Sequence, residues 1–380
     1  AKVHITTPGP GGRSEAYHKL RGVRQLREFP ASETTVAEAL KTAGYATAHL
    51  GKWHQPTSSP GDHGFDVHDG ATANGGPGIF EDPNPKDVFG MTERAINFME
   101  NQLDAGRPFY LQLSHFAVHA PTLARAASIA RFEKLPTGAR HSDVEYAAMT
   151  HDLDAGVGVL LDKIDSLGLA KNTYVVFMSD NGAAGGRRRP KENLPLRGGK
   201  GGFYEGGIRV PLIVRGPGIE AGGTCRESVI GYDLLPTFCT LAGVTVPDGV
   251  EGADLMPLLH GKAGQFARPK SLLFHHPHYG EGPQVPESAV ILGDYKLIRN
   301  YDRDSVELFN LADDLGETKD LSMKEPEMRA EMEKELSRRL LETKAQMPTT
   351  NPNYDPEAER PRRRRPGARG REGAPNRRSR

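Results

Sequence analysis

Three short apolar runs that each end directly in a polar motif constrain the fold of this chain more than any other feature. The runs are Tyr45–Leu50, Pro108–Leu113 and Tyr174–Met178, and the motifs that follow them are GKWH, SHFAVHAP and SDNG. Runs of this length and composition predict buried β-strands. Apolar residues recur three and four positions apart in Thr35–Gly44 and Ser142–Leu167, which predicts helices before the first strand and between the second and third.

Alternating strands and helices are typical of an α/β fold, with a mostly parallel or mixed sheet covered by helices on both faces. Ligands bind such sheets beyond the carboxyl ends of the strands. All three polar motifs lie at that end of their strands. We therefore expect them to converge on one rim of the sheet, where a binding site would form.

The chain after Gly261 has a different pattern. Leu272–His276, Ala289–Arg299 and Val306–Leu311 are three β-like runs separated by turn residues, and a charged helical stretch follows from about Glu325 to Lys344. These elements predict a small antiparallel sheet with one helix.

The predicted organisation has three parts. Residues 1–265 would form the main α/β domain, of which the N-terminal part is expected to be missing, and residues 266–346 the smaller α+β subdomain. Residues 347–380 are rich in Pro, Asn and Arg and are predicted to be a disordered tail. A chain of 380 residues, 37% of them hydrophobic, can bury one sizeable core and a smaller unit.

Charge is distributed unevenly along the chain. Arg360–Arg380 holds ten Arg and one Glu, which leaves 39 basic against 48 acidic residues in the remainder. This stretch contains no aromatic residue that could stack on bases, so it does not favour nucleic acid as a partner. Salt-dependent attraction to polyanions and a solvated extension without a specific partner are the two interpretations.

Cysteine content and hydropathy exclude several classes of protein. Cys225 and Cys239 are the only cysteines, and they form neither a disulfide framework nor a zinc motif. No apolar run is long enough to span a bilayer. The chain begins at Ala1 without Met or a signal-like segment, so we expect its N-terminus to have been processed or truncated.

The SDNG motif is a candidate metal site. Asp180 and Asn181 place a carboxylate and an amide oxygen side by side at a strand end, and hard cations such as Ca²⁺ or Mg²⁺ prefer oxygen ligands. Asn-Gly is also a common turn dipeptide, so a simple turn is the alternative. Two ligands alone do not fill a calcium shell.

The other motifs supply cations. Lys52 and His54 point to the same side of an extended segment and could hold an oxyanion, and His119 is an acid/base candidate beside them. Lys200 lies in the glycine-rich segment Leu196–Gly207, whose backbone could approach an anion closely. The alternatives are a solvated strand end for Lys52 and His54, a structural histidine for His119 and a flexible surface loop for Lys200.

Taken together, these motifs resemble the formylglycine-dependent sulfatases of the alkaline phosphatase superfamily. The likeness runs in order through GYATAHLGKWH, HFAVHAP, VVFMSDNG and LRGGKGGFYEGGIRVPLIVRGPG, and continues through DLLPTFCTLAGV and GDYKLI to ELFNL. It implies an α/β sandwich with a smaller C-terminal subdomain. It also implies sulfate ester hydrolysis, with a sulfated small molecule or polysaccharide as substrate and a periplasmic or extracellular location.

The resemblance also implies roles for individual residues. Asp180 and Asn181 would be ligands of Ca²⁺, with Mg²⁺ as the alternative. Lys52 would bridge the nucleophile and a sulfate oxygen, and His54 would act as the base that releases sulfate. His119 would be the general acid for the leaving oxygen, assisted by Lys200.

The histidine cluster FHHPHY is a further candidate for substrate contact. By the same resemblance, the smaller subdomain packs beside the active site, so His276 and His278, with His275, would contact the leaving group. A transition-metal site and a polar strand end are the alternatives.

Two elements of the family are absent from the sequence. No CxPSR or SxPSR motif, whose first residue becomes formylglycine, and no N-terminal Asp-Asp pair occurs in it. Both are expected upstream of Ala1, so we expect the recorded chain alone to be inactive. The alternatives are a phosphatase or phosphodiesterase of the same superfamily and, if the chain is complete, a non-catalytic anion-binding protein.

Overall fold

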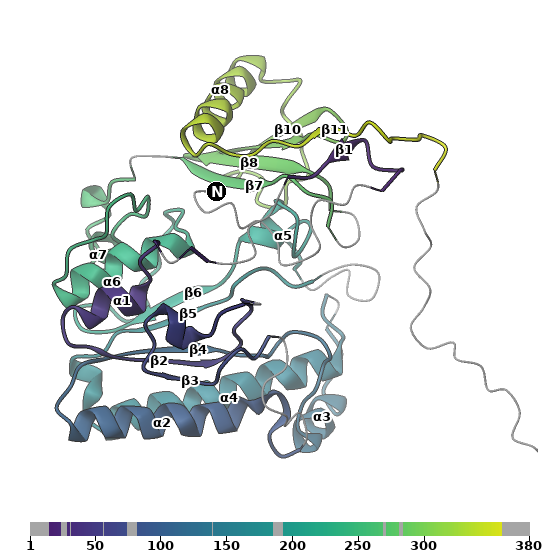
Figure 1. Cartoon of the computed structure of the whole chain (residues 1–380). Coiled ribbons are helices and arrows are strands. Elements are labelled where there is room, and N and C mark those ends of the chain that lie inside the picture. Colours follow the sequence, from purple (N-terminus) through teal and green to yellow (C-terminus); the bar gives the residue numbers. More distant parts are fainter. Residues whose placement is uncertain are drawn as a thin grey trace, which may run out of the picture.

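The structure is a computed structural model that describes residues 15–23, 29–30, 32–55, 57–73, 82–138, 140–184, 193–268, 271–280 and 284–358. Its larger part is a layered α/β arrangement, and a small antiparallel sheet with one helix lies on top of it in Figure 1. The predicted α/β fold is confirmed. No helix in these ranges is long and apolar enough to cross a membrane.

The centre of the larger part is a parallel sheet of β2 (Ala46–Gly51), β3 (Val67–His68) and β4 (Phe109–Ser114), in the order β3-β2-β4. β2 pairs with β4 in register from Ala46↔Phe109 to Gly51↔Ser114. All six residues of β2 are buried, as expected for a strand with partners on both sides.

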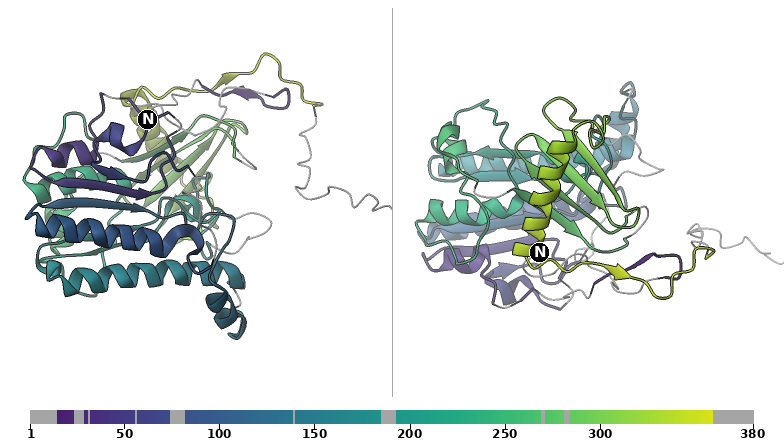
Figure 2. Two further views of the ribbon diagram at one scale, coloured as in Figure 1. Left: turned by 60° about the horizontal axis from the view of Figure 1, so that its bottom comes forward. Right: turned by 90° about the horizontal axis from the view of Figure 1, so that it is seen from above.

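Helices cover both faces of this sheet. α2 (Val88–Asp104) and α4 (Val144–Ser166) lie along one face, with α3 (Ala126–Glu133) beside α4, and α1 (Val36–Lys41) and α6 (Leu234–Ala242) lie on the other (Figures 1 and 2).

The start of α1 follows from its sequence. Thr35 Oγ1 accepts a hydrogen bond from the Glu38 amide at 3.1 Å, and Glu38 Oε2 accepts one from the Thr35 amide at 2.7 Å. This capping box satisfies two amides that lack partners within the helix.

A second pair of strands follows. β5 (Val175–Met178) pairs antiparallel with β6 (Leu212–Arg215). Among the described residues, β4 pairs only with β2 and β5 only with β6. The run Tyr174–Met178 was predicted to be a buried strand, and this is wrong for its second half, since Phe177 and Met178 are each 37% exposed. The open side of the strand pair explains this exposure.

The C-terminal unit is a four-stranded antiparallel sheet with the order β10-β9-β8-β7. Its elements are β7 (Leu272–His276), β8 (Glu287–Leu292), β9 (Tyr295–Asn300), β10 (Ser305–Asn310) and α8 (Pro326–Glu342). The predicted single run Ala289–Arg299 is wrong, because the chain turns at Gly293 and forms two strands. Gly293 has a φ of +58°, a conformation that glycine adopts at little cost.

The predicted disorder from residue 347 is also wrong for residues 347–358. β11 (Thr349–Thr350) pairs antiparallel with β1 (Leu20–Arg21). The buried side chain of Asn351 donates hydrogen bonds to the backbone oxygens of Glu15 at 3.1 Å and His18 at 2.8 Å. Pairing with a distant segment orders this stretch despite its polar composition. The predicted disorder of residues 359–380 lies outside the described residues.

The remaining short helices connect these elements. They are η1 (Pro60–His63), η2 (Pro85–Asp87), η3 (Leu169–Lys171), α5 (Glu205–Ile208), η4 (Gly231–Asp233), α7 (Met256–Leu259) and η5 (Ala263–Gln265).

Candidate active site

Two of the polar motifs, GKWH and SHFAVHAP, meet at the carboxyl ends of the parallel strands β2 and β4. The Lys52 amide donates a 2.7 Å hydrogen bond to the backbone oxygen of Ser114, which extends the pairing of β2 and β4 by one residue beyond the last registered pair. This places GKWH directly beside SHFAVHAP. Lys52, His54, His119, Asp180 and Lys200 all line one hollow.

The electrostatic environment of Lys52 and His54 agrees with the placement of the two lysines and two histidines around one hollow. Burial lowers the pKa of Lys52 from its ordinary value, and Lys200 lowers it further while Asp180 opposes the shift. Burial also lowers the pKa of His54, and repulsion from Lys52, Lys200 and His119 adds to this effect. A bound anion would relieve this mutual repulsion, so the site favours a group such as sulfate or phosphate.

His119 is held by its own backbone. Its Nδ1 lies 2.7 Å from the backbone oxygen of Ala120, and since a carbonyl only accepts, Nδ1 carries the proton. Nε2 is then the atom that can exchange a proton with a ligand. The His119 side chain is exposed and lines the hollow, so a ligand can reach it, as a general acid or base requires.

The loop that carries Lys200 is fastened to the SDNG segment by its backbone. The Lys200 amide donates to the Ala183 oxygen at 3.0 Å, and the Gly182 amide donates to the Gly207 oxygen at 3.0 Å. A Cβ at Gly182 would lie 1.8 Å from the oxygen of Gly206, so only glycine permits this approach. The backbone of the glycine-rich loop therefore approaches the SDNG segment closely, and its approach to an anion stays a prediction.

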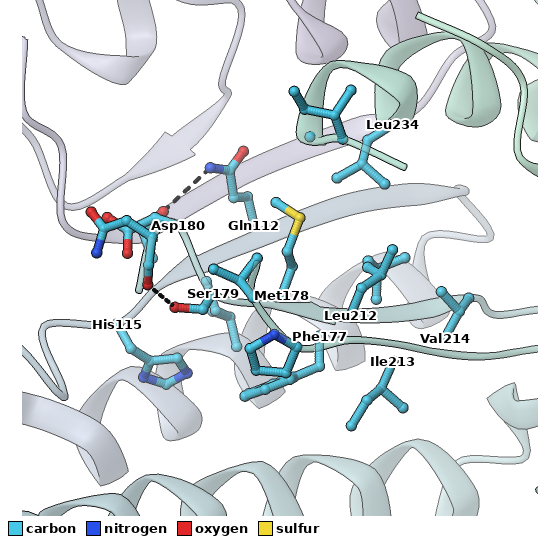
Figure 3. A pocket seen from close by; sticks show the side chains of 18 of the residues that line it. Gln112, His115, Phe177, Met178, Ser179, Asp180, Leu212, Ile213, Val214 and Leu234 are labelled. Carbon is cyan, nitrogen blue, oxygen red and sulfur yellow. Dashed lines mark hydrogen bonds between the residues drawn. The ribbon is translucent and has the colours of Figure 1, made fainter. Parts of the chain in front are cut away.

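Asp180 and Asn181 lie at the polar end of the hollow. In Figure 3 Asp180 and Gln112 lie at one end of the drawn part of the hollow, and the apolar side chains of β5 and β6 lie toward the other end. Asn181 Nδ2 donates to the Gly182 backbone oxygen at 3.1 Å, and its side-chain oxygen takes no part in that hydrogen bond. In the described part of the chain no group of three or more His, Cys, Asp or Glu side chains could hold a metal ion. The pair fits a hard cation chemically, but it needs further oxygen ligands.

The hollow is larger than a small-molecule site requires. Its volume is about 5760 Å³, against roughly 300–1,000 Å³ for typical ligand pockets. All residues of β4, β5 and β6 line it, and Ile213 of β6 is 63% exposed. The residues of β4 are each half-buried, whereas those of β2 are fully buried. The open edges of β4 and β5 therefore both border the hollow.

The predicted histidine cluster is less accessible than its polar character suggested. His276 and His278 line the same hollow but are only 8% and 3% exposed. Burial lowers the pKa of both, that of His278 to about 4, so both rings are neutral at pH 7. His275 instead contacts Ser288 Oγ at 2.7 Å and the Gln346 backbone oxygen at 2.9 Å. Substrate contact by His276 and His278 stays a prediction.

Two features of the site were not foreseen. Asn193 bridges the loop and the SDNG segment, because its side chain accepts from the Ala183 amide at 2.9 Å and donates to the Ala183 and Gly198 oxygens at 3.0 Å each. Lys296 in GDYKLI is fully buried. The burial of Lys296 could have been predicted from the sequence, since a charged residue inside an apolar strand requires charged or polar partners.

Lysine and histidine side chains line the hollow together with one carboxylate, Asp180, and one side-chain amide, Asn181, and this composition suits a bound anion. The family model described as Sulfatase matches residues 11–244, and the model described as N-sulphoglucosamine sulphohydrolase, C-terminal, matches residues 199–346. The chain belongs to the sulfatase family.

Individual relatives agree with this assignment. A sulfatase of Formosa agariphila is 32% identical over 62% of this chain and 45% of its own length. Human arylsulfatase A is 31% identical over 66% of this chain and 55% of its own length. An ulvan-active sulfatase of Formosa agariphila is 27% identical over 83% and 67%. The chain thus spans about half the length of the Formosa agariphila sulfatase and of human arylsulfatase A.

Solved structures share the fold. The structure of Ps i-CgsB in complex with k-i-k-neocarrahexaose has a TM-score of 0.71 at 24% identity and covers 89% of this chain and 78% of that one. A protein in complex with its substrate D-glucosamine-2-N,6-O-disulfate has a TM-score of 0.67 at 20% identity, covering 83% of each chain.

Proposed function

We propose that this chain is part of a sulfuric ester hydrolase that acts on sulfated carbohydrate. The observation that carries the proposal is that Lys52, His54, His119 and Lys200 line one hollow together with Asp180, where Lys52, Lys200 and His119 all lower the pKa of His54. Attack at sulfur and departure of an alkoxide both concentrate negative charge. Cations already in position stabilise that charge without reorganising during the reaction.

Each of the four side chains has a distinct task in the proposed reaction. Lys52, half-buried at the end of β2, holds a sulfate oxygen and the nucleophile together. Lys200 and His119 face the leaving oxygen, and His119 Nε2 delivers the proton that this oxygen needs. Burial and neighbouring cations lower the pKa of His54 and keep its imidazole neutral, so it can accept a proton when sulfate is released.

We further propose that a strand outside residues 1–380 enters the hollow between β4 and β5 and carries the nucleophile. Support comes from the two open strand edges, whose amides and carbonyls need partners, and from the apolar side chains that surround them. A strand parallel to β4 would end beside Asp180 and the four cations. The shorter length of this chain relative to its curated relatives agrees with such a segment.

Asp180 and Asn181 would hold the metal, Ca²⁺ or Mg²⁺, together with oxygen ligands from the inserted strand. The metal would neutralise charge on sulfate, and a formylglycine on that strand would supply the nucleophile. The carboxylate and amide oxygens of the pair suit such an ion.

Carbohydrate is the proposed substrate class because several relatives are named for it. Similar proteins include an ulvan-active sulfatase, an N-acetylgalactosamine-6-sulfatase and a protein in complex with D-glucosamine-2-N,6-O-disulfate. In this proposal neutral His276 and His278 orient the sugar through hydrogen bonds. We also propose a periplasmic or extracellular location, which cell fractionation with antibody detection would test.

The decisive experiment compares hydrolysis of 4-nitrophenyl sulfate and 4-nitrophenyl phosphate by two proteins. One is the 380-residue chain, and the other adds the upstream coding segment. We expect sulfate ester turnover by the longer protein only, with Asp180→Ala of that protein as the inactive control. Preference for the phosphate ester would favour the phosphatase alternative, and no turnover of either by the longer protein would favour a non-catalytic anion-binding protein.

A further inference from the structure

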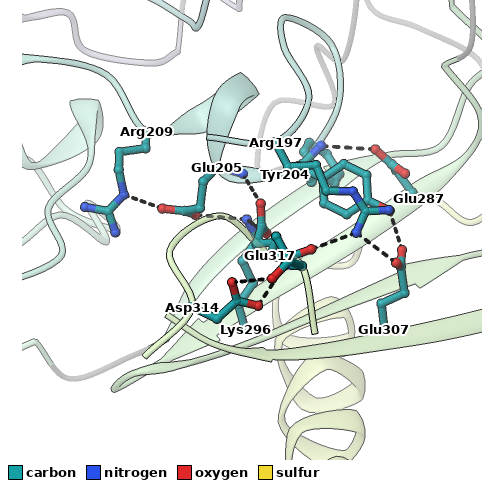
Figure 4. A network of polar contacts seen from close by, with 11 residues as sticks. Arg197, Tyr204, Glu205, Arg209, Glu287, Lys296, Glu307, Asp314 and Glu317 are labelled. Carbon is teal, nitrogen blue, oxygen red and sulfur yellow. Dashed lines mark hydrogen bonds and ion pairs between the residues drawn. The ribbon is translucent and has the colours of Figure 1, made fainter. Parts of the chain in front are cut away.

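A buried ion network joins the Lys200 loop to the C-terminal sheet. Lys296 Nζ of β9 lies 2.9 Å from Glu205 Oε1 and 2.7 Å from Glu317 Oε1. Lys296 and Glu317 are fully buried, and Glu205 is 2% exposed. Figure 4 shows the three side chains between the turn of α5 and the strands below it.

The network continues into the backbone of the loop. The amide of Glu205 donates to Glu317 Oε2 at 2.6 Å, and Arg209 pairs with the carboxylate of Glu205 from the far end of α5. Both ends of this short helix are therefore held by charged groups. Glu317 itself has a φ of +53°, which a residue with a side chain adopts rarely and which its contacts must hold in place.

A second set of contacts fastens the start of the same loop. The Arg197 guanidinium lies 3.8 Å from the centre of the Tyr204 ring, and it donates to Glu307 Oε1 at 3.3 Å and to the Glu317 oxygen at 3.0 Å. The Tyr204 hydroxyl donates to the carboxylate of Glu307. Residues on both sides of Lys200 thus contact β10 or the segment after it.

These contacts lead on to the site. The Gly206 amide, next to Glu205, donates to the Arg197 oxygen at 2.7 Å and closes the loop. The oxygen of Gly207 then accepts from Gly182, the residue after Asn181. Hydrogen bonds and the short backbone stretches between them therefore connect Lys296 to the Lys200 loop and to the segment of the candidate metal ligands.

The positive charges of Lys296 and Arg209 offset the cost of burying the carboxylates of Glu205 and Glu317. Burial raises the pKa of Glu205, but Lys296 and Arg209 outweigh this and lower it overall. Burial raises the pKa of Glu317 against the opposing effect of Lys296. Removal of the buried ammonium would leave two carboxylates without their shared partner, a strongly destabilising change.

We propose that Lys296, with Glu205 and Glu317, is a positioning group that fixes Lys200 and the Asn181 backbone relative to each other. The proposal rests on the proposed function for the role of Lys200, and it assigns to the C-terminal sheet control over the placement of the anion-binding lysine. The three residues touch no substrate. They act through the backbone of the loop.

Hydrogen exchange tests this without relying on turnover. Lys296→Met in the 380-residue chain should speed hydrogen exchange of the Lys200, Gly206 and Gly182 amides by about tenfold or more. The reason is that loss of the ammonium leaves the buried carboxylates of Glu205 and Glu317 without their shared partner. Glu205→Gln is the milder second variant, since it keeps the Lys296–Glu317 pair, and it should show the same pattern to a smaller degree.

Asp152→Asn is the matched control. Asp152 is buried and paired with Arg125 at 2.9 Å in the α3–α4 region, away from the C-terminal sheet. It should lower the melting temperature without speeding exchange in the Lys200 loop. Loop exchange that is unchanged in both network variants, or raised equally by Asp152→Asn, would overturn the positioning role.

Inorganic sulfate binding by calorimetry provides the second readout. At a temperature where the variants remain folded, Lys296→Met should weaken sulfate binding about tenfold and Glu205→Gln should weaken it less, while Asp152→Asn leaves it unchanged. Absence of sulfate binding by the unaltered chain would overturn the proposed function, and the exchange data would still decide the network. If folded Lys296→Met and Glu205→Gln bind sulfate as well as the unaltered chain, the positioning role is overturned while the proposed function stands.

Discussion

Lys200→Met should reveal the coupling among the cations at the strand ends. Lys200 is the second-largest contributor to the lowered pKa of Lys52, and it also lowers that of His54. Loss of its charge removes a repulsion from both groups. The pKa of His54 should therefore rise toward its ordinary value in the variant.

The expected loss of sulfate affinity follows from the exposure of this lysine. A hydrogen bond to a charged group contributes about 1.5–3 kcal/mol, and Lys200 is exposed, so screening favours the lower end. Affinity should fall about tenfold, since 1.4 kcal/mol corresponds to a factor of ten. Added salt should shrink this difference.

The pH dependence has a defined sign. The folded-state pKa of His54 is depressed, so its positive charge appears only as the pH falls through that value. Sulfate binding should strengthen over this range, and bound sulfate should in turn raise the pKa of His54. In Lys200→Met the same strengthening should begin at a higher pH.

Two measurements check this reasoning. Calorimetry gives sulfate affinity across pH and salt, and NMR titration of the imidazole signals gives the pKa of His54. Lys134→Met, which removes an exposed lysine outside the hollow, is the control and should change neither. An unchanged pKa of His54 together with unchanged affinity in Lys200→Met would refute the shared cationic site.

Three further predictions concern other parts of the molecule. In the longer protein, His119→Ala should lower turnover by about a hundredfold with little change in KM, and the loss should be smaller for substrates with good leaving groups, as steady-state kinetics would show. Deletion of residues 360–380 should reduce binding to a sulfated polysaccharide at low salt but not at moderate salt, and equal binding at low salt would exclude this attraction. Asp233→Ala should lower the free energy of unfolding by about 3–5 kcal/mol in urea titrations. The reason is that fully buried Asp233 pairs with Arg268 and accepts hydrogen bonds from the Ile230 and Ala253 amides. Asp162→Ala, which changes an exposed carboxylate, is the control and should leave the free energy of unfolding unchanged.

Elements with a strong local pattern were predictable to within a few residues. The run Tyr45–Leu50 corresponds to β2 at Ala46–Gly51, and the helix predicted at Ser142–Leu167 is α4 at Val144–Ser166. Asp143 caps that helix by accepting from the Tyr146 amide at 2.9 Å. Apolar periodicity and capping act over a few neighbouring residues, so the sequence carries them directly.

Elements that depend on distant partners were not predictable. β11 forms because Thr349–Thr350 pairs with Leu20–Arg21, far away in the chain. The split of Ala289–Arg299 into β8 and β9 depends on a turn at Gly293 that a continuous apolar run conceals. Exposure of Phe177 depends on which strand lies beside β5, and local composition does not contain that information.

The sequence by itself determined the α/β fold, the order of the polar motifs and the residue types of the cationic site. The tertiary structure alone decided that Lys200 is fastened to Ala183 and that Lys296 is buried between Glu205 and Glu317. The physical reason is that burial of a charge is tolerated only where opposite charges converge. In this chain those charges come from segments about 90 residues before Lys296 and about 20 after it, which only folding brings together.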